Sequence, residues 1–548
     1  MLAAISPAES ATKASPPPPK SGAMPAPHHL ECEPGDWWPK TPSPSVSIRA
    51  ARLLPPWVWA LAALTAARAL ASMLVPVLPE EAYHWNFARH LDWSYFDHPP
   101  MLAWSIALGR SVFGDTAMGI RFVPLIFSLG TALLIVRLAR GFYGESIALT
   151  VVLLLALEPT IFVVPSWGFP DSPLLFFWAL SLTLVWEAVS TRRFGWWLWA
   201  GAALGCAMLS KYTAVFLVPS MLAYLLTSRR DRFWLMTRWP YLAVLISLVL
   251  FLPVIYWNWS HQWASLRFQS VDRLRAASDL EIGRGLHFIA EQWLGVLPLS
   301  LPIAAAAWWR GVRSSRREEL FLFWTFTPMM AFFFVMGWTP SSHWLWPLPA
   351  YLSLTVAMAG ILIEEEGSTL ARWWTRWRWR LVALVSGGAL LALIHAVFVL
   401  PYIPALRETY GWDRVAARAL ALRASFHKNQ SFYLGIGLRP YPCPSQLAFH
   451  TNEPALVYSN NLIGLRSLAY AYWGEPPDKL VGRDAVVVFE GGDPNGNARR
   501  IIATYFKSID GTEVIDVPIS KIPFVTSPQV RFTLVRARGY RGLQPKAG

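Results

Sequence analysis

Long apolar runs with almost no charge recur along most of the chain. The clearest of these runs cover 122–136, 147–164, 241–257, 320–337 and 381–400. A helix rises about 1.5 Å per residue, so crossing the hydrocarbon core of a membrane takes roughly 20 apolar residues. The pattern therefore predicts an α-helical polytopic membrane protein and excludes an ordinary soluble domain.

Composition and charge support this prediction. Hydrophobic residues make up 54% of the chain and charged residues 15%, whereas soluble domains carry about 25% charged residues. The net charge of +14 does not indicate nucleic-acid binding, because the arginines cluster in short segments between the apolar runs. That distribution is typical of cytoplasmic loops, so we expect membrane lipids and no nucleic acid as partners.

Arginine-rich segments precede the first apolar run and follow every second one, which predicts the sidedness of the chain. They cover 49–52, 137–140, 192–193, 229–232, 310–317 and 372–380. With these segments inside, we expect about eleven transmembrane helices, a cytoplasmic N-terminus and an extracytoplasmic C-terminal part. A first outer loop, 77–121, and a tight turn near Lys211 then lie outside.

The two ends of the chain differ from the apolar part. Residues 1–50 are rich in Pro, Ser and Ala, which predicts a disordered cytoplasmic tail. The first apolar run begins near Leu53, too late for a cleavable signal peptide, so 51–403 is the predicted transmembrane domain. Residues 404–548 predict a small extracytoplasmic α/β domain. Its expected strands lie at 455–459, 485–489, 512–517 and 530–535, and its expected helices near 412–425 and 444–450.

The first outer loop holds the richest chemistry in the chain. It reads EEAYHW from Glu80 to Trp85 and LDWSYFDHPP from Leu91 to Pro100. Carboxylates placed against a membrane are costly and usually mark function, although acids in a generic loop are more often simply solvated. The mixture of these acids with tyrosine and tryptophan beside a bilayer favours a functional site.

One reaction that suits these residues is sugar transfer from a lipid phosphate. A carboxylate must accept the proton of the acceptor hydroxyl, and positive charge must stabilise the departing phosphate. Glu80 and Glu81 supply the first requirement. The second can come from a basic side chain or a metal ion, and aromatic rings such as Tyr83 and Trp85 can stack on sugars. The candidates for the basic side chain are His98, Lys211 and Arg273.

These motifs resemble the bacterial branch of the C-type membrane glycosyltransferases. That branch contains proteins similar to the dolichyl-phosphate-mannose protein mannosyltransferases and the lipid A aminoarabinose and galacturonic acid transferases. Its usual pattern is Asp-Glu-Ala-Tyr-Tyr-Trp followed by Tyr-Tyr-Asp-His-Pro-Pro. Further similar segments lie at 169–178, 204–214, 253–269, 343–351 and 444–451, and the resemblance covers about 50–500.

The resemblance implies an inverting glycosyltransferase with a polyprenyl-phosphate sugar donor and an envelope acceptor, which is lipid A, a glycan, a lipid or a protein. Glu80 matches the presumed catalytic base, although relatives carry Asp there, one methylene shorter. Glu81 and Asp171 are further catalytic candidates. The remaining matches are Tyr83, Trp85, His98, Lys211, Arg273 and His343 for substrate binding, and Asp97 and His261 for a divalent metal ion, whose involvement is left open.

Simpler explanations exist for several of these residues. Asp171 can be an ordinary helix cap, Lys211 can extend to the interface from a helix end, and His261 and His343 can be interfacial histidines. The chain shows no Gly-rich phosphate loop, so no nucleotide cofactor is expected. Two rival functions remain: a transporter or flippase of lipid-linked substrates, for which mid-span charges would be expected, and an inactive family member with a binding role.

Overall fold

The computed structural model describes most of the chain after residue 53. The described residues are 54–272, 281–293, 301–340, 343–364, 369–394, 409–426, 431–437, 439–491, 496–518 and 529–543. All of them belong to one compact unit. The predicted tail at 1–50 and the predicted domain boundary near 404 lie outside the described residues.

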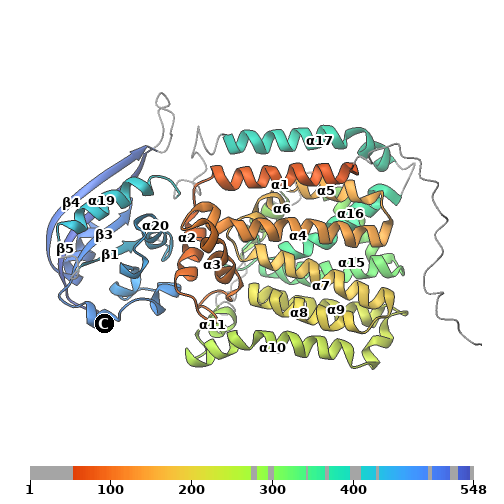
Figure 1. Ribbon diagram of the computed structural model, residues 1–548, viewed down its shortest axis with the longest axis horizontal. Coiled ribbons are helices and arrows are strands. Elements are labelled where there is room, and N and C mark those ends of the chain that lie inside the picture. The colour runs from red at the N-terminus through yellow and green to blue at the C-terminus, as the bar shows by residue number, and fades with distance from the viewer. Residues whose placement is uncertain are drawn as a thin grey trace, which may run out of the picture. The chain divides into compact units, whose positions relative to one another are not determined.

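The apolar runs form helices that lie side by side in the helical part of the chain (Figure 1). Five of them are long and apolar enough to cross a membrane: α1 (Pro56–Leu74), α4 (Ala117–Tyr143), α7 (Asp171–Thr191), α10 (Trp239–Ser260) and α15 (Arg317–Met336). A sixth candidate span is bent by 101°. It consists of α5 (Ile147–Leu157) followed by α6 (Pro159–Val163) and η1 (Val164–Ser166), and it counts as a span only if the bent segment is taken as one.

Shorter or more charged helices occupy the other predicted spans. They are α8 (Gly195–Ser210), η2 (Tyr212–Phe216) with α9 (Leu217–Thr227), α14 (Leu301–Arg313), α16 (Leu348–Glu364) and α17 (Thr369–Ile394). Within the described ranges, the structure thus confirms several apolar helices, while the count of about eleven spans stays a prediction. Lys211 lies at the turn between α8 and α9, as the expected hairpin requires.

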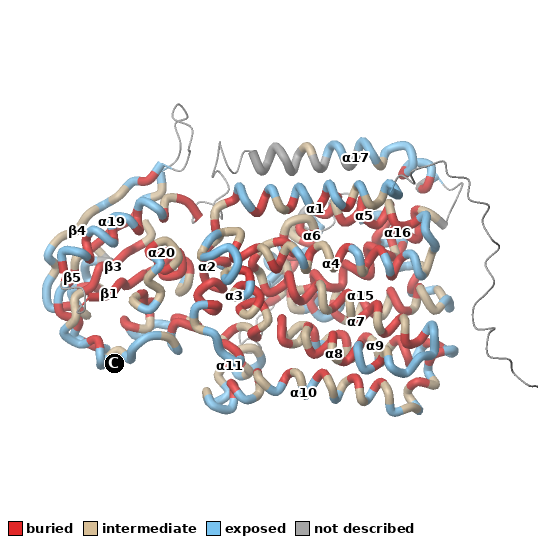
Figure 2. The backbone as a smooth tube through the Cα atoms, viewed as in Figure 1, coloured by how far each residue is buried: buried red, intermediate tan, exposed pale blue. Residues whose placement is uncertain are grey.

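Burial follows the packing between these helices (Figure 2). The largest buried cluster joins apolar side chains of α1, α4, α5, α7, α15 and α16. By contrast α10 leaves Leu245, Leu248 and Leu252 about half exposed. Exposed leucines on a helix of this length suit contact with lipid chains, because lipid is as apolar as leucine.

The segment predicted as a loop at 77–121 is largely helical. It contains α2 (Pro79–Arg89), α3 (Met101–Phe113) and the first turn of α4. Pro79 is well placed at the first position of α2, because its missing N–H would be unpaired there. Glu80 and Glu81 in the first turn interact favourably with the helix dipole. The segment 258–291 also contains helices, α11 (Ala264–Arg267) and α13 (Ile282–Glu291).

The C-terminal part forms a five-stranded sheet in the order β2-β1-β3-β5-β4. The strands are β1 (Ser431–Ile436), β2 (Val457–Tyr458), β3 (Asp484–Glu490), β4 (Phe506–Pro518) and β5 (Gln529–Tyr540), and the helices are α19 (Trp412–Ala424), α20 (Pro442–Thr451) and α21 (Asn497–Tyr505). Strand β1 pairs in parallel with β2 and β3, whereas β5 pairs antiparallel with β3 and β4. This confirms the expected α/β character; β1 and α21 were not predicted.

Helix α2 packs against α20 of the C-terminal part. The side chain of Gln446 donates from Nε2 to the carbonyl oxygen of Val77 at 2.8 Å. Ala82 and Trp85 share one apolar cluster with Leu447 and other buried residues of the C-terminal part. The residues that carry the sequence motif are therefore fixed from two directions, by the apolar helices and by the sheet part.

Two buried ionisable side chains lie at the bend between α5 and α6. The sequence analysis did not single out either of them. Arg68 of α1 donates to the carbonyl oxygens of Ile161 and Phe162, both at 2.7 Å. A helix as short as α6 leaves its last carbonyls without intrahelical donors, so Arg68 satisfies them. Glu158, at the bend itself, is 1% exposed, and neither carboxyl oxygen has a hydrogen-bond partner among the described residues.

Replacing Glu158 by leucine is expected to stabilise the protein. An unpaired buried polar group costs about 1–3 kcal/mol, and leucine has a similar volume without that cost. We expect the free energy of unfolding to rise by this amount, measured as a higher thermal midpoint in lipid nanodiscs. Glu187→Leu is the control, because its surface ion pair with Arg137 contributes at most about 1 kcal/mol. A clear loss of stability in Glu158→Leu would show that the carboxyl group has an essential partner.

Candidate active site

Glu80 presents a carboxylate at the N-terminal turn of α2 and is exposed to solvent. Protein atoms crowd it from the other directions, and this desolvation raises the pKa of Glu80 to about 7. The negative charge of Asp171 raises the pKa further, whereas Lys211 and Arg439 oppose the shift. A carboxylate that titrates near neutral pH and is reached by solvent is well suited to accept a proton.

Asp171 and Lys211 form a buried ion pair beside Glu80. The ammonium nitrogen of Lys211 lies 2.8 Å from Oδ1 and 2.9 Å from Oδ2 of Asp171. Asp171 is the first residue of α7, and Lys211 caps the C-terminus of α8. The helix-cap explanation for Asp171 does not describe its position, because Pro170 is the capping residue. Lys211 is 8% exposed and points to Asp171 instead of extending to the interface.

Glu81 lies in a different environment from its neighbour. Its side chain is fully buried and accepts hydrogen bonds from Arg121 Nε at 2.7 Å, from the Gly168 backbone N–H at 2.9 Å and from the Leu78 backbone N–H at 3.0 Å. Arg121 also contacts the second carboxyl oxygen through Nη2. The carboxylate oxygens of Glu81 are occupied by these hydrogen bonds and have no access to solvent. Glu81 therefore holds α2 in place and is not positioned to contact the hydroxyl group of the sugar acceptor.

Tyr83 and Trp85, expected to stack on a sugar, are buried in the protein. The hydroxyl of Tyr83 donates to Asp97 Oδ1 at 3.2 Å and accepts from the Ala469 backbone N–H at 3.0 Å. The indole N–H of Trp85 donates to Asp115 at 2.7 Å. In this conformation both rings fix α2 against its neighbours, because neither presents a free face.

The two proposed metal ligands each have contacts within the protein. Asp97 is 7% exposed and bonds to Tyr83, whereas His261 stacks on Trp257 with ring centroids 4.0 Å apart. Across the described part of the chain, no group of three His, Cys, Asp or Glu side chains is arranged to hold a metal ion. A divalent metal ion at this site therefore stays a prediction.

The other candidate phosphate and substrate ligands have mixed positions. His98 is partly exposed, and its ring lies 5.2 Å from that of His84. His343 is exposed; its Nδ1 accepts from the Leu345 backbone N–H at 3.3 Å and its ring stacks on Trp344. Arg273 lies outside the described residues, so its role stays a prediction.

Two arginines near the motif were missed by the sequence analysis. Arg121, at the start of α4, is fully buried and also donates to the carbonyl oxygens of Ser72, Val75 and Pro76. An arginine at the edge of an apolar run was a usable signal. Arg439 comes from the C-terminal part and lies close enough to Glu80 to lower its pKa; its sequence position gave no indication of that proximity.

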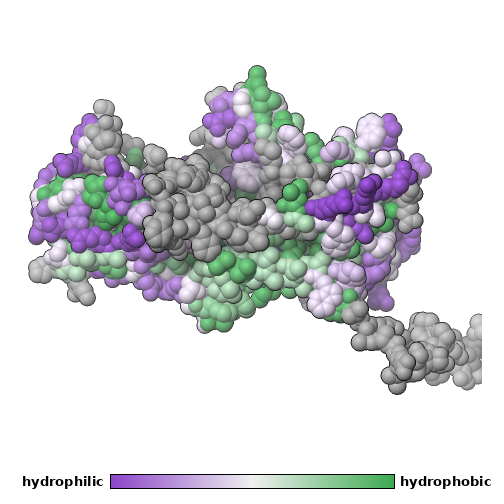
Figure 3. All heavy atoms as spheres, turned by 90° about the horizontal axis from the view of Figure 1, so that it is seen from above, coloured by the Kyte–Doolittle hydropathy of each residue, from purple (hydrophilic) through white to green (hydrophobic). Residues whose placement is uncertain are grey.

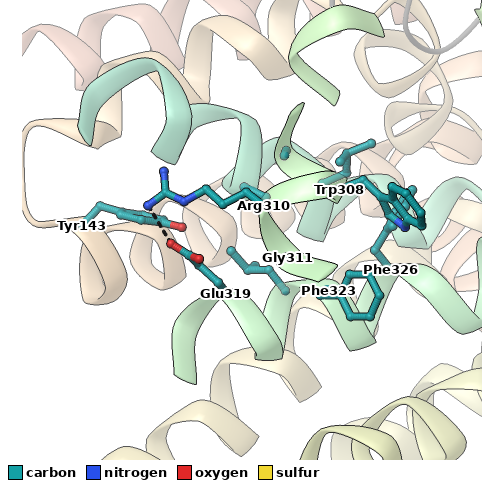
Figure 4. A pocket seen from close by; sticks show the side chains of 11 residues that line it. Tyr143, Trp308, Arg310, Gly311, Glu319, Phe323 and Phe326 are labelled. Atoms are coloured by element: carbon teal, nitrogen blue, oxygen red, sulfur yellow. Dashed lines mark ion pairs between the residues drawn. The ribbon is translucent and has the colours of Figure 1, made fainter. Parts of the chain in front are cut away.

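A pocket between α14 and α15 is not a substrate site. The side chains of Tyr143, Trp308, Arg310 and Glu319 surround it, and Arg310 Nη2 lies 2.6 Å from Glu319 Oε1 (Figure 4). Its volume is about 20 Å³, which holds roughly one water molecule. A sugar does not fit there, so this pocket is not a candidate active site.

Comparison with known proteins agrees with the motif. Residues 97–257 match the family described as dolichyl-phosphate-mannose-protein mannosyltransferase. The chain is 27% identical over 63% of its length to a lipid A galacturonosyltransferase of Rhizobium johnstonii, of which 72% is covered. It is 24% identical over 62% of its length to an undecaprenyl phosphate-alpha-4-amino-4-deoxy-L-arabinose arabinosyl transferase of Pseudomonas fluorescens, of which 59% is covered.

The fold agrees as well. The crystal structure of ArnT from Cupriavidus metallidurans bound to undecaprenyl phosphate superposes with a TM-score of 0.60 at 18% identity, over 88% of this chain and 98% of that one. Its apo state gives 0.61 at 17% identity, over 88% and 97%. The resemblance of the sequence motifs to the C-type membrane glycosyltransferases is thus confirmed, and the chain shares the fold of ArnT.

Proposed function

We propose that the protein is an inverting glycosyltransferase that moves a sugar from a polyprenyl-phosphate carrier to an envelope acceptor. The observation that carries this proposal is the solvent-accessible carboxylate of Glu80, with a pKa of about 7, beside the buried Asp171–Lys211 pair. A base and a phosphate-binding cation are the two groups that the reaction needs. Glu80 follows the apolar helix α1 within six residues, and Lys211 lies at the end of α8; a lipid phosphate would be found at such helix ends.

In the proposed step, Glu80 accepts the proton of the acceptor hydroxyl as its oxygen attacks C1 of the sugar. The new bond from C1 to the acceptor oxygen forms on the face opposite the phosphate. The bond between C1 and the phosphate oxygen breaks, and its electron pair leaves with the polyprenyl phosphate. The configuration at C1 is inverted, and Glu80 returns its proton to solvent.

Lys211 can hold the departing phosphate and stay paired with Asp171 at the same time. An ammonium group has three N–H donors, and two of them suffice for the two oxygens of Asp171. The third can bind a phosphate oxygen. Arg439 adds positive charge from the other side of Glu80.

The names of similar proteins suggest the substrates. One relative is a lipid A galacturonosyltransferase, another is an arabinosyl transferase named for an undecaprenyl phosphate-linked sugar, and the solved structure holds undecaprenyl phosphate. We therefore propose an undecaprenyl-phosphate-type donor and place lipid A first among the acceptors. Glu81, through Arg121, is assigned to positioning α2.

Mass spectrometry of envelope glycolipids, from cells with and without the protein, tests the proposed function. We expect a lipid species that gains the mass of one sugar only when the protein is present, and its loss with Glu80→Gln at equal protein abundance. Unchanged glycolipids and glycoproteins in both backgrounds would contradict the proposal.

A transporter is the second candidate, and buried Glu158 and Arg68 are the observation that favours it. Charges within apolar helices often line transport routes. Arg68, however, is used by the carbonyl groups of α6. A transporter of lipid-linked sugar would move the donor across a vesicle without consuming it, whereas the proposed enzyme converts it to a glycoside and free polyprenyl phosphate.

The sidedness of the site is a further proposal, based on the arginine-rich segments. A reporter that is active only outside the cytoplasm should work when fused after Gly548 and fail when fused near Ser314. The expected reason is that arginine-rich segments are retained inside. The opposite pattern of activity would place Glu80 on the cytoplasmic face and overturn the proposed location.

A further inference from the structure

A groove separate from the Glu80 site lies where the first turns of α17 meet α5 and the end of α16. Its volume is about 500 Å³. The residues that define its chemistry are Ser146, Thr150, Arg372, Trp374, Arg376 and Arg378. None of them belongs to the catalytic or positioning residues described above, so the groove needs an explanation of its own.

The charged side chains that the structure describes in the lining of this groove are all positive. Three arginines line it, and its lining contains no aspartate or glutamate. Glu145, next to Ser146 in the sequence, is already occupied by Arg140 and by the indole N–H of Trp57. The side chains of the glutamates at 364–366 lie outside those that the structure describes. The lining therefore favours an anionic ligand.

One donor of an arginine that lines the groove has no hydrogen-bond partner among the described residues. Nε of Arg378 is buried and makes no hydrogen bond to any described residue. A buried N–H left without an acceptor costs free energy, and more so on a charged group. Arg376 and Arg378 both line the groove, and their planar guanidinium groups suit phosphate oxygens.

The back of the groove is apolar. Leu362, Ile363 and Ala371 line it, and Trp374 is buried with its indole N–H directed to Thr150 Oγ1 at 3.4 Å. Outside the groove Trp373, Trp377 and Trp379 are exposed, as expected for side chains at a membrane interface. Figure 3 shows a hydrophilic stripe beside apolar surface over the end of the helical part where α17 begins.

We propose that this groove binds the headgroup of an anionic phospholipid, with the lipid phosphate held by the arginines that line the groove and the upper part of the acyl chains against the apolar wall. A basic mouth and an apolar wall at a membrane surface match both parts of such a lipid. A free phosphate ion shares the charge but has no group for the apolar wall. The bound lipid would link α17 to α5 and α16.

Lipid retention by the purified full chain in nanodiscs tests this site. The probes are cardiolipin in a phosphatidylcholine background, phosphatidylcholine alone, and phosphatidylcholine with inorganic phosphate. We expect cardiolipin to raise the thermal midpoint and inorganic phosphate to leave it unchanged. In the double variant Arg376→Gln, Arg378→Gln, cardiolipin affinity should fall about 30-fold, because each arginine near anionic lipid contributes roughly a fivefold factor.

The matched control is Arg229→Gln, Arg230→Gln, which removes two arginines from another segment predicted to be cytoplasmic. Its cardiolipin affinity should stay within about twofold of the unchanged protein, since neither residue lines the groove. Folding of both variants is checked by the thermal midpoint in phosphatidylcholine alone. Equal loss of affinity in both double variants would show diffuse attraction to the membrane, and stabilisation by inorganic phosphate would show a site for a free anion; either result overturns the proposal.

Discussion

Glu80→Gln is expected to lose about 10²–10⁴-fold in turnover, the usual contribution of a general base, while donor affinity changes little. Glutamine keeps the shape and hydrogen-bonding capacity of the side chain but cannot accept the proton. Glu80→Asp should retain substantial activity, because the family pattern carries Asp at this position. The measurement is the steady-state rate of sugar transfer by purified protein in nanodiscs, with donor binding determined separately.

The same residue predicts the pH dependence. The pKa of Glu80 is about 7, and only the deprotonated form accepts a proton. The rate should therefore fall about tenfold per pH unit below pH 7 and level off above it. Asp171→Asn removes a negative neighbour and leaves Lys211 unpaired; both changes lower the pKa of Glu80 and should move the acidic limb to lower pH. An unshifted limb would show that another group titrates.

Arg121→Leu is expected to lower the free energy of unfolding by about 3–5 kcal/mol, because it leaves the buried carboxylate of Glu81 without its charged partner. The carbonyl oxygens of Ser72, Val75 and Pro76 lose their donor as well. The measurement is a large decrease in the thermal midpoint in nanodiscs.

Two further variants test whether the loss of stability in Arg121→Leu comes from the unpaired buried charge of Glu81. Arg121→Leu combined with Glu81→Leu should recover part of the loss, since no buried charge remains. Arg137→Gln, which breaks an exposed pair with Glu187, should cost at most about 1 kcal/mol. If Arg121→Leu were as mild as Arg137→Gln, the buried pair would not hold α2 in place.

Local patterns predicted much of this structure. Apolar runs located most of the long helices, because burial and lipid contact both require apolar side chains over a fixed length. The grouping of Glu80 with Asp171 and Lys211 was also anticipated, since each lies at an end of an apolar segment. Their pairing was not: Lys211 was assigned to the carrier phosphate, and the structure shows it bound to Asp171.

The remaining features depend on contacts between distant segments. The helical form of 77–121 was missed because its mixed aromatic and acidic pattern has no clear period, although Pro79 followed by two acids is a helix-start signal. Tyr83 and Trp85 were taken for sugar-stacking residues, and they are buried by partners such as Ala469 and Asp115. The approach of Arg439 to Glu80 depends on how the sheet part packs against α2.

The central claim is that Glu80 is the base in sugar transfer from a polyprenyl phosphate. The most direct test is a single-turnover experiment with a polyprenyl-phosphate sugar labelled in the sugar, lipid A as acceptor, and purified protein with Glu80 or with Gln at that position. We expect equal amounts of glycosylated lipid A with inverted configuration and of free polyprenyl phosphate, formed about 10²–10⁴-fold more slowly with Glu80→Gln. Equal rates for the two proteins would contradict the claim.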